Sequence, residues 1–174
     1  MALDEKLWQR CADFHGHVCG GLAIGYQAAR YAAALMGADF SRDEELVCVA
    51  ENDACGIDAI QVLLGCSVGK GNLLFHMRGK QAFSFYDRRG GKSFRLVFND
   101  LPEGTAGTME YVLSHAPEEL FTVKEARPMP QPAKLFRSYH CACCGEKTGE
   151  KWIRLVDGEY RCLDCMEEYD RFHV

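Results

Sequence analysis

Phe14-His15-Gly16-His17-Val18-Cys19-Gly20-Gly21 is the stretch around which this sequence is organised, because it brings two imidazoles and a thiol together among flexible glycines. Residues two apart on an extended chain point to the same face, so we expect His15, His17 and Cys19 on one side. The sequence turns helical after Cys19, which places its thiol near a helix amino terminus. That position favours the thiolate, the form that binds metal or attacks electrophiles.

Composition and charge limit the class of protein. A chain of 174 residues with 48% apolar content suits one ordinary domain plus a small appendage. Its net charge of -5 and pI near 5.7 argue against nucleic acid as a partner. We find neither a secretory signal nor an apolar run long enough to span a bilayer, so we expect a cytoplasmic protein with no membrane partner. Ten cysteines in that compartment indicate metal ligands or redox thiols rather than a disulfide framework.

Two helices are predicted first, over residues 3–13 and 20–36, and Gly37 ends the second. The second helix carries a surface of small residues, which allows close approach by another element or by a second copy of the chain. Its members are Gly21, Gly25, Ala28, Ala29, Ala32 and Ala33. The residues leave both interpretations open.

A strand-to-helix junction follows. Residues 45–52 are typical of a buried strand, and a helical stripe of apolar residues runs from Ile57 to Leu64, ending at Gly65. Cys55 therefore lies at a helix start, where sites in open α/β layers gather. Beyond it, residues 73–78, 82–88 and 93–99 alternate with glycine turns, which predicts an antiparallel meander.

The glycine-rich loop between the junction and the first of these strands, residues 65–72, invites comparison with a phosphate loop. Three residues rather than four separate its first two glycines, and Gly71 stands where a magnesium-binding hydroxyl would be needed. We therefore reject a nucleotide site, although Lys70 and the loop amides remain candidates for an anion. Cys66 in this loop is a candidate site thiol.

Three prolines between Arg127 and Pro132 form a semi-rigid linker and the clearest domain boundary. We expect an α+β domain over residues 1–127, a linker over 128–137 and a small domain over 138–174.

The small domain carries a zinc pattern. Two C-x2-C pairs are separated by seventeen residues, a spacing typical of structural zinc with a closed shell, although disulfides or a redox pair remain alternatives. The four cysteines are Cys141, Cys144, Cys162 and Cys165. A hairpin around Asp157-Gly158 and a helix over 166–172 complete the outline of a treble-clef finger, whose metal would supply stability that so small a core lacks.

Three blocks in this order, residues 14–19, 55–61 and 65–73, together resemble the family of the E-type accessory protein of formylmethanofuran dehydrogenase. The resemblance implies a thioredoxin-like α+β core with a five-stranded mixed sheet flanked by helices, a metal site built from the His/Cys motif, and a treble-clef tail. It also implies a homodimer and a place beside a molybdenum or tungsten oxidoreductase. The family usually has Pro after the motif cysteine, where this chain has Gly20, which affects how Cys19 is held.

The first functional hypothesis is a metal or thiol active site in the larger domain. His17 and Cys19 are the expected primary ligands, with Cys55 third and Cys66 or His15 behind. Mixed nitrogen and sulfur ligands suit zinc or another divalent transition metal. Asp58, one turn after Cys55, is expected to orient a ligand or move a proton, so Cys19, His17 and Asp58 are the candidate catalytic residues.

Two alternatives stay open, and the residues do not decide whether the protein is an enzyme. One is a thiol redox protein in which Cys19 cycles with Cys55 or Cys66, although the larger domain has no C-x-x-C motif. The other is a non-enzymatic adapter or metal carrier whose finger docks a partner, such as a molybdenum or tungsten oxidoreductase.

Overall fold

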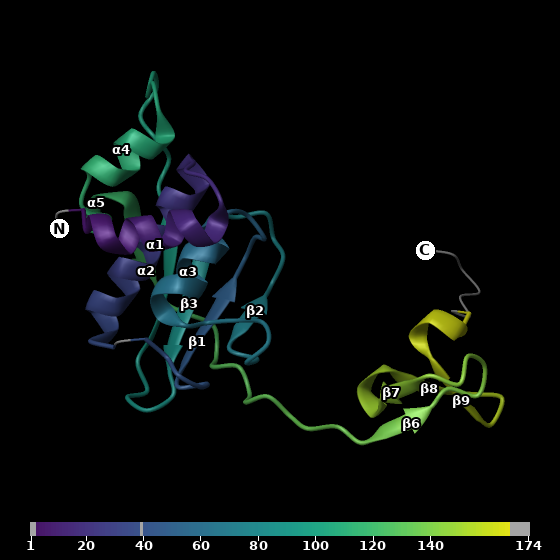
Figure 1. Cartoon of the computed structure of the whole chain (residues 1–174). Coiled ribbons are helices and arrows are strands. Elements are labelled where there is room, and N and C mark those ends of the chain that lie inside the picture. The colour runs from purple at the N-terminus through teal and green to yellow at the C-terminus, as the bar shows by residue number, and fades with distance from the viewer. Residues whose placement is uncertain (1–2, 39, 168–174) are drawn as a thin grey trace. The chain divides into compact units, whose positions relative to one another are not determined.

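The structure is a computed structural model that describes residues 3–38 and 40–167 (Figure 1). Its contacts divide the chain into one unit that ends at Pro132 and a second that begins at Ala133. The proline-containing segment belongs to the first unit, because the Arg88 guanidinium donates a hydrogen bond to the Pro130 carbonyl oxygen at 2.9 Å. In the described part of the chain, no helix is both long and apolar enough to cross a membrane.

A five-stranded mixed sheet forms the centre of the first unit, in the order β2-β1-β3-β4-β5. Strands β1 and β2 are parallel and the remaining neighbours are antiparallel. The prediction of an α+β domain with a five-stranded mixed sheet flanked by helices is therefore confirmed, while the thioredoxin-like comparison stays a prediction. The strands are β1 (Leu46–Ala50), β2 (Leu73–Phe75), β3 (Ala82–Asp87), β4 (Ser93–Phe98) and β5 (Phe121–Lys124).

The predicted antiparallel meander is wrong at its first step. Strand β2 lies parallel to β1 on the side away from β3, so no hairpin joins β2 to β3. The sequence pattern predicts one strand over residues 73–78, but β2 ends at Phe75 and leaves a longer connection. That connection is held at the end of β1, where the His76 amide donates to Ala50 and the Arg78 amide to Glu51. The connection is therefore long enough to pass around β1 before β3 begins.

Helices pack on one face of this sheet, with α1, α2 and α3 gathered together in Figure 1. The core between helices and sheet includes Cys48, Phe83, Phe85 and Leu96 from the strands, all fully buried. The helices are α1 (Glu5–His15), α2 (Gly20–Met36), α3 (Gly56–Leu64), α4 (Thr108–Ser114) and α5 (Pro117–Leu120).

The small-residue surface of α2 is used within the chain, against α3. A Cβ atom built on Gly25 would lie 2.0 Å from the carbonyl oxygen of Gly56, the first residue of α3. A Cβ on Gly56 would in turn lie 3.1 Å from the Gly25 Cα atom. Glycine on both sides is thus what lets the two backbones touch. The surface therefore gives no separate support for a homodimer, which stays a prediction.

The second unit consists of two hairpins. One pairs β6 (Ser138–His140) with β7 (Lys147–Gly149), which the sequence analysis did not anticipate, and the other pairs β8 (Ile153–Val156) with β9 (Glu159–Cys162). Short 3-10 turns cover Glu150–Trp152 and Leu163–Cys165. Met166 and Glu167 are not helical, and the rest of the helix expected over 166–172 lies outside the described residues.

Replacing Gly25 by alanine tests the contact between α2 and α3. The added methyl group would meet backbone atoms of Gly56, which cannot swing aside as a side chain could, so we expect a loss of at least about 3 kcal/mol in the free energy of unfolding. Urea denaturation measures it. Gly69→Ala is the matched control, because Gly69 has no neighbour within 4 Å of the added atom and no left-handed backbone. Equal stability of the two variants would contradict this account of the helix contact.

Candidate metal centres

Three predicted ligands meet at one point in the first unit. One ligand atom from each of His15, Cys19 and Cys55 lies within 4.8 Å of the other two, and each residue is half-buried. Separations of this order fit three ligands around one transition-metal ion, since zinc–sulfur bonds are about 2.3 Å and zinc–nitrogen bonds about 2.0 Å. Mixed imidazole and thiolate ligands suit zinc or a related metal.

Each ligand stands at the end of a helix. His15 is the last residue of α1, because that helix continues beyond its predicted end until Gly16 closes it in the left-handed conformation, φ 88°. His15 is therefore helical rather than extended. Cys19 is the N-cap of α2, where its sulfur accepts a hydrogen bond from the Leu22 amide at 3.3 Å. Cys55 is the residue before α3.

The contact between α2 and α3 also brings the two thiols together. A Cβ built on Gly21, in the first turn of α2, would lie 3.2 Å from the Cys55 Cβ atom and 3.9 Å from the Cys19 sulfur. Gly20 has a similar role toward α4, since a Cβ there would lie 2.7 Å from the Thr108 side chain. A proline at position 20, usual in the resembled family, would therefore require a shift of Thr108.

Asp58 fixes the orientation of the His15 ring. Its Oδ2 atom lies 2.7 Å from His15 Nδ1, while His15 Nε2 lies 4.0 Å from the Cys19 sulfur. Gln61 donates a hydrogen bond to the other carboxylate oxygen of Asp58 at 3.2 Å. A carboxylate that accepts from Nδ1 leaves Nε2 free to bind metal, which is the usual outer partner of a metal-bound histidine.

The electrostatics of Cys55 differ from the expectation for a helix start. Its pKa is raised, first because burial desolvates the thiolate and then because of its contact with the Cys19 thiol. The helix amino terminus does not outweigh these two effects. A bound cation would reverse the balance, because a coordinating thiol loses its proton to the metal.

His17, expected as a primary ligand, lies outside the group of three. Its side chain is exposed, and its ring packs against the His15 ring with the two centroids 4.4 Å apart. The reason is local: once α1 extends to His15 and Gly16 turns the chain, residues 15, 17 and 19 no longer alternate along one strand. The glycine signal that placed His15 on the helix was present in the sequence but was interpreted only as a bend.

Cys66 is also separated from this group. Its side chain is fully buried in the core, its sulfur donates to the Leu46 carbonyl oxygen at 3.6 Å, and burial raises its pKa to about 12. The structure thus gives Cys66 a packing role, and within residues 3–38 and 40–167 it belongs to neither group of converging ligands.

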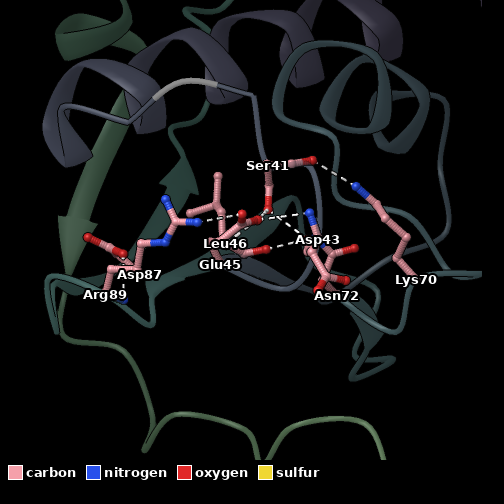
Figure 2. Close-up of polar contacts among 8 residues, drawn as sticks. All are labelled: Ser41, Asp43, Glu45, Leu46, Lys70, Asn72, Asp87 and Arg89. Atoms are coloured by element: carbon pink, nitrogen blue, oxygen red, sulfur yellow. Dashed lines mark hydrogen bonds and ion pairs between the residues drawn. The ribbon is translucent and has the colours of Figure 1, made fainter.

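The loop that carries Cys66 satisfies its own polar groups, as Figure 2 shows. Lys70 donates to the Ser41 carbonyl oxygen at 2.8 Å, and the buried Asn72 amide donates to the carbonyl oxygens of Asp43 and Leu46. Lys70 is therefore engaged within the fold, so the loop is a structural support rather than an anion site.

The second centre lies in the second unit. Ligand atoms of Cys141, Cys144, Cys162 and Cys165 all lie within 4.8 Å of one another. The Cys144 and Cys162 sulfurs are 3.9 Å apart, close to the edge of about 3.8 Å expected for a tetrahedral zinc–thiolate shell. The donor set and spacing therefore fit a metal such as zinc in a closed shell.

Backbone amides prepare this second centre for thiolates. Hydrogen bonds from the amides of Cys144 and Cys162 lower the pKa of Cys141 to about 6. The Cys162 amide lies 3.3 Å from the Cys141 sulfur. Gly145 takes a left-handed conformation, φ 77°, which closes the turn after the first pair. Cys143 is exposed and lies outside the group of four.

The comparisons with known proteins agree with this architecture. The family model described as "FmdE, Molybdenum formylmethanofuran dehydrogenase operon" matches residues 14–135, which is most of the first unit. The chain is thus a member of the FmdE family, and the resemblance found in its three sequence blocks is confirmed.

A solved structure and a curated relative extend the comparison. The chain is similar to a tungsten formylmethanofuran dehydrogenase FmdE-like protein from Syntrophus aciditrophicus, with a TM-score of 0.68, 21% identity and coverage of 92% of this chain and 90% of that one. At this identity the likeness shows the fold. The chain is also 26% identical to a probable S-adenosyl-L-methionine-binding protein from Archaeoglobus fulgidus, over 94% of this chain. It spans about half the length of that relative, 53%.

Removing the metal from the second centre should affect the second unit first. A structural zinc site supplies the folding energy of a small domain, so a strong chelator should expose the chain after Ala133 to protease while leaving the first unit intact. Limited proteolysis with mass spectrometry measures this. Cys162→Ser should reproduce the effect without chelator, and Cys143→Ser should not. Full protease resistance of the chelated chain would contradict a metal-dependent fold.

Proposed function

We propose that the first unit binds one transition-metal ion, zinc or a close relative, through His15, Cys19 and Cys55. The observation that carries the proposal is the convergence of these ligand atoms from three separate helix ends. Three protein ligands around a tetrahedral ion leave a fourth position for water or a substrate, whereas the four cysteines of the second unit form a closed, structural shell.

In this arrangement the chain's own residues bind and orient. Asp58 holds the His15 ring, and the Leu22 amide donates to the Cys19 sulfur and favours its thiolate form. The exposed His17 ring beside His15 is placed to accept or release a proton at the mouth of the site. When bound, the metal would supply Lewis acidity at its open position.

Membership of the FmdE family supports an accessory role. The family description refers to a molybdenum formylmethanofuran dehydrogenase operon, and the similar solved structure is named after a tungsten enzyme. We therefore infer that the partner is a molybdenum or tungsten oxidoreductase, met by the second unit. That unit offers exposed apolar side chains for such a contact, among them Trp152, Leu155 and Tyr160.

Metal content after the second centre is disabled tests the first site. In a Cys141→Ser/Cys144→Ser background, we expect the chain to retain about one ion, because three ligands of the first unit remain. A further Cys55→Ser substitution should remove it, whereas His17→Ala should leave it within about twofold, as expected for a residue outside the shell. Elemental analysis measures both. Loss of all metal in the parent background would refute the first site as a tight one, and equal loss from both added variants would refute this ligand set.

Asp58→Asn tests the orientation of His15. Loss of an outer carboxylate partner of a metal-bound histidine typically costs about 10- to 100-fold in metal affinity. We expect a decrease of that size in a competition assay with a chromophoric chelator, with the metal-free stability nearly unchanged. Asp13→Asn is the control, because that exposed carboxylate accepts a hydrogen bond from Gln9 and lies outside the group of three ligands. Equal affinities of the two variants would mean that Asp58 does not act through His15.

A dithiol function is the second candidate, because the Cys19 and Cys55 sulfurs both belong to the group within 4.8 Å. Forming a disulfide would release two protons and pass two electrons to an oxidant. Treatment of the metal-free chain with diamide should then link these two cysteines, as peptide mapping would show, and added zinc should protect them if the site binds metal. Reversible oxidation that zinc does not prevent would favour the redox function over metal binding.

A further inference from the structure

The face of the sheet opposite the helices carries a polar cluster that the metal centres do not use. Val49, Ser84, Arg95 and Lys124 lie in one row across β1, β3, β4 and β5. Because side chains alternate along a strand, this row points away from the core row of Cys48, Phe85 and Phe94. Ser84 and Tyr86 of β3 are nevertheless almost fully buried, since the chain after β5 packs over this face.

A hollow of about 300 Å³ opens on this face with an excess of positive charge. Four cationic side chains and His76 line it, against two carboxylates; they are Arg78, Lys80, Arg95, Arg127, Glu51 and Glu125. Arg95 is already neutralised, because its Nε and Nη2 atoms donate to both carboxylate oxygens of Glu51 at 2.5 and 2.8 Å.

The remaining cations of this hollow are not engaged in ion pairs. Among the described residues, no ion pair involves Arg78, Lys80 or Arg127. Their field is felt by neighbouring groups: the pKa of His76 is lowered first by desolvation and then by Arg78 and Arg127, while Glu51 counteracts it. Charges collected in a hollow with protein walls focus the potential and attract an anion.

His76 supplies a polar atom with no partner. Its Nε2 is buried and makes no hydrogen bond among the described residues, which is unusual for a buried side-chain nitrogen. The ring follows β2, and its backbone amide is fixed by the Ala50 carbonyl oxygen at 2.8 Å. A buried nitrogen without a partner beside unpaired cations is a group that a ligand oxygen would satisfy.

A second, more apolar hollow of about 240 Å³ adjoins the first and shares Glu51, His76 and Arg127 with it. Its other walls include Val49, Leu74, Phe75, Tyr86, Pro128 and Pro130. The exposed Phe75 ring and the two prolines give it flat apolar sides. Neither hollow is lined by any of the residues assigned to the metal centres.

We propose that this face of the sheet binds a small molecule with an anionic group, phosphate or carboxylate, joined to a flat apolar part. Arg78, Lys80 and Arg127 hold the charge, His76 Nε2 donates to one of its oxygens, and the apolar part lies against Tyr86 and Pro128. Charge complementarity selects the anion, and the adjoining hollow selects a ligand larger than a free inorganic ion.

Calorimetric titration of the full chain at low ionic strength tests the proposal, with phenyl phosphate and inorganic phosphate as probes. We expect saturable binding of phenyl phosphate, about tenfold tighter than inorganic phosphate because the ring is buried. Arg78→Gln/Arg127→Gln should weaken it about tenfold, since hydrogen bonds to charged groups are the strong ones. Lys6→Gln/Arg42→Gln is the control, because it removes the same charge from exposed residues that line neither hollow.

Histidine-selective 15N spectra of the wild-type chain give a readout that does not depend on a variant. The His76 Nε2 signal should shift with phenyl phosphate at the same dissociation constant, and the His115 signal should not. Absence of saturable binding, an equal loss in both double variants, or a stationary His76 signal would overturn the proposal. Equal affinity for the two probes would overturn its apolar half.

Discussion

The contact between Gly25 of α2 and Gly56 of α3 is the constraint on which the candidate active site depends. Two helix backbones that meet with no side chain between them place their first residues within a few ångströms. Cys19 and Cys55 immediately precede those first residues, so the same contact that packs the core also pairs the thiols. A larger residue at either glycine would separate the helices and, with them, two of the three ligands. Fold and candidate chemistry thus share one cause.

The two centres differ in the way their ligands are supplied. In the second unit, two C-x2-C turns provide all four sulfurs, and backbone amides stabilise the thiolate of Cys141 locally. In the first unit, the ligands come from three helices, and their separation depends on tertiary packing. The local centre suits a structural role, whereas the long-range centre leaves room for a ligand from outside the protein. This contrast explains why one protein would contain two sites of similar chemistry.

Local patterns predicted the local features. The mixed sheet, the α2 helix and the cysteine spacing of the second unit follow from residue types, short-range periodicity and the family resemblance, and the three sequence blocks led to the FmdE family. The order of β2, β1 and β3 did not follow, because a short connection around a strand end has no local signature. Nor did the exclusion of His17, which results from two additional helical residues before Gly16. The helix partner of the small-residue surface could be identified only once α2 and α3 were seen together.

Anomalous X-ray scattering from one crystal, recorded at the absorption edge of the bound metal, tests the central claim most directly. The account predicts two peaks, one surrounded by the four sulfurs of the second unit and one bonded to His15 Nε2, Cys19 Sγ and Cys55 Sγ at about 2.0–2.3 Å. A single peak in the second unit, with the Cys19 and Cys55 sulfurs joined to each other or turned apart, would contradict it.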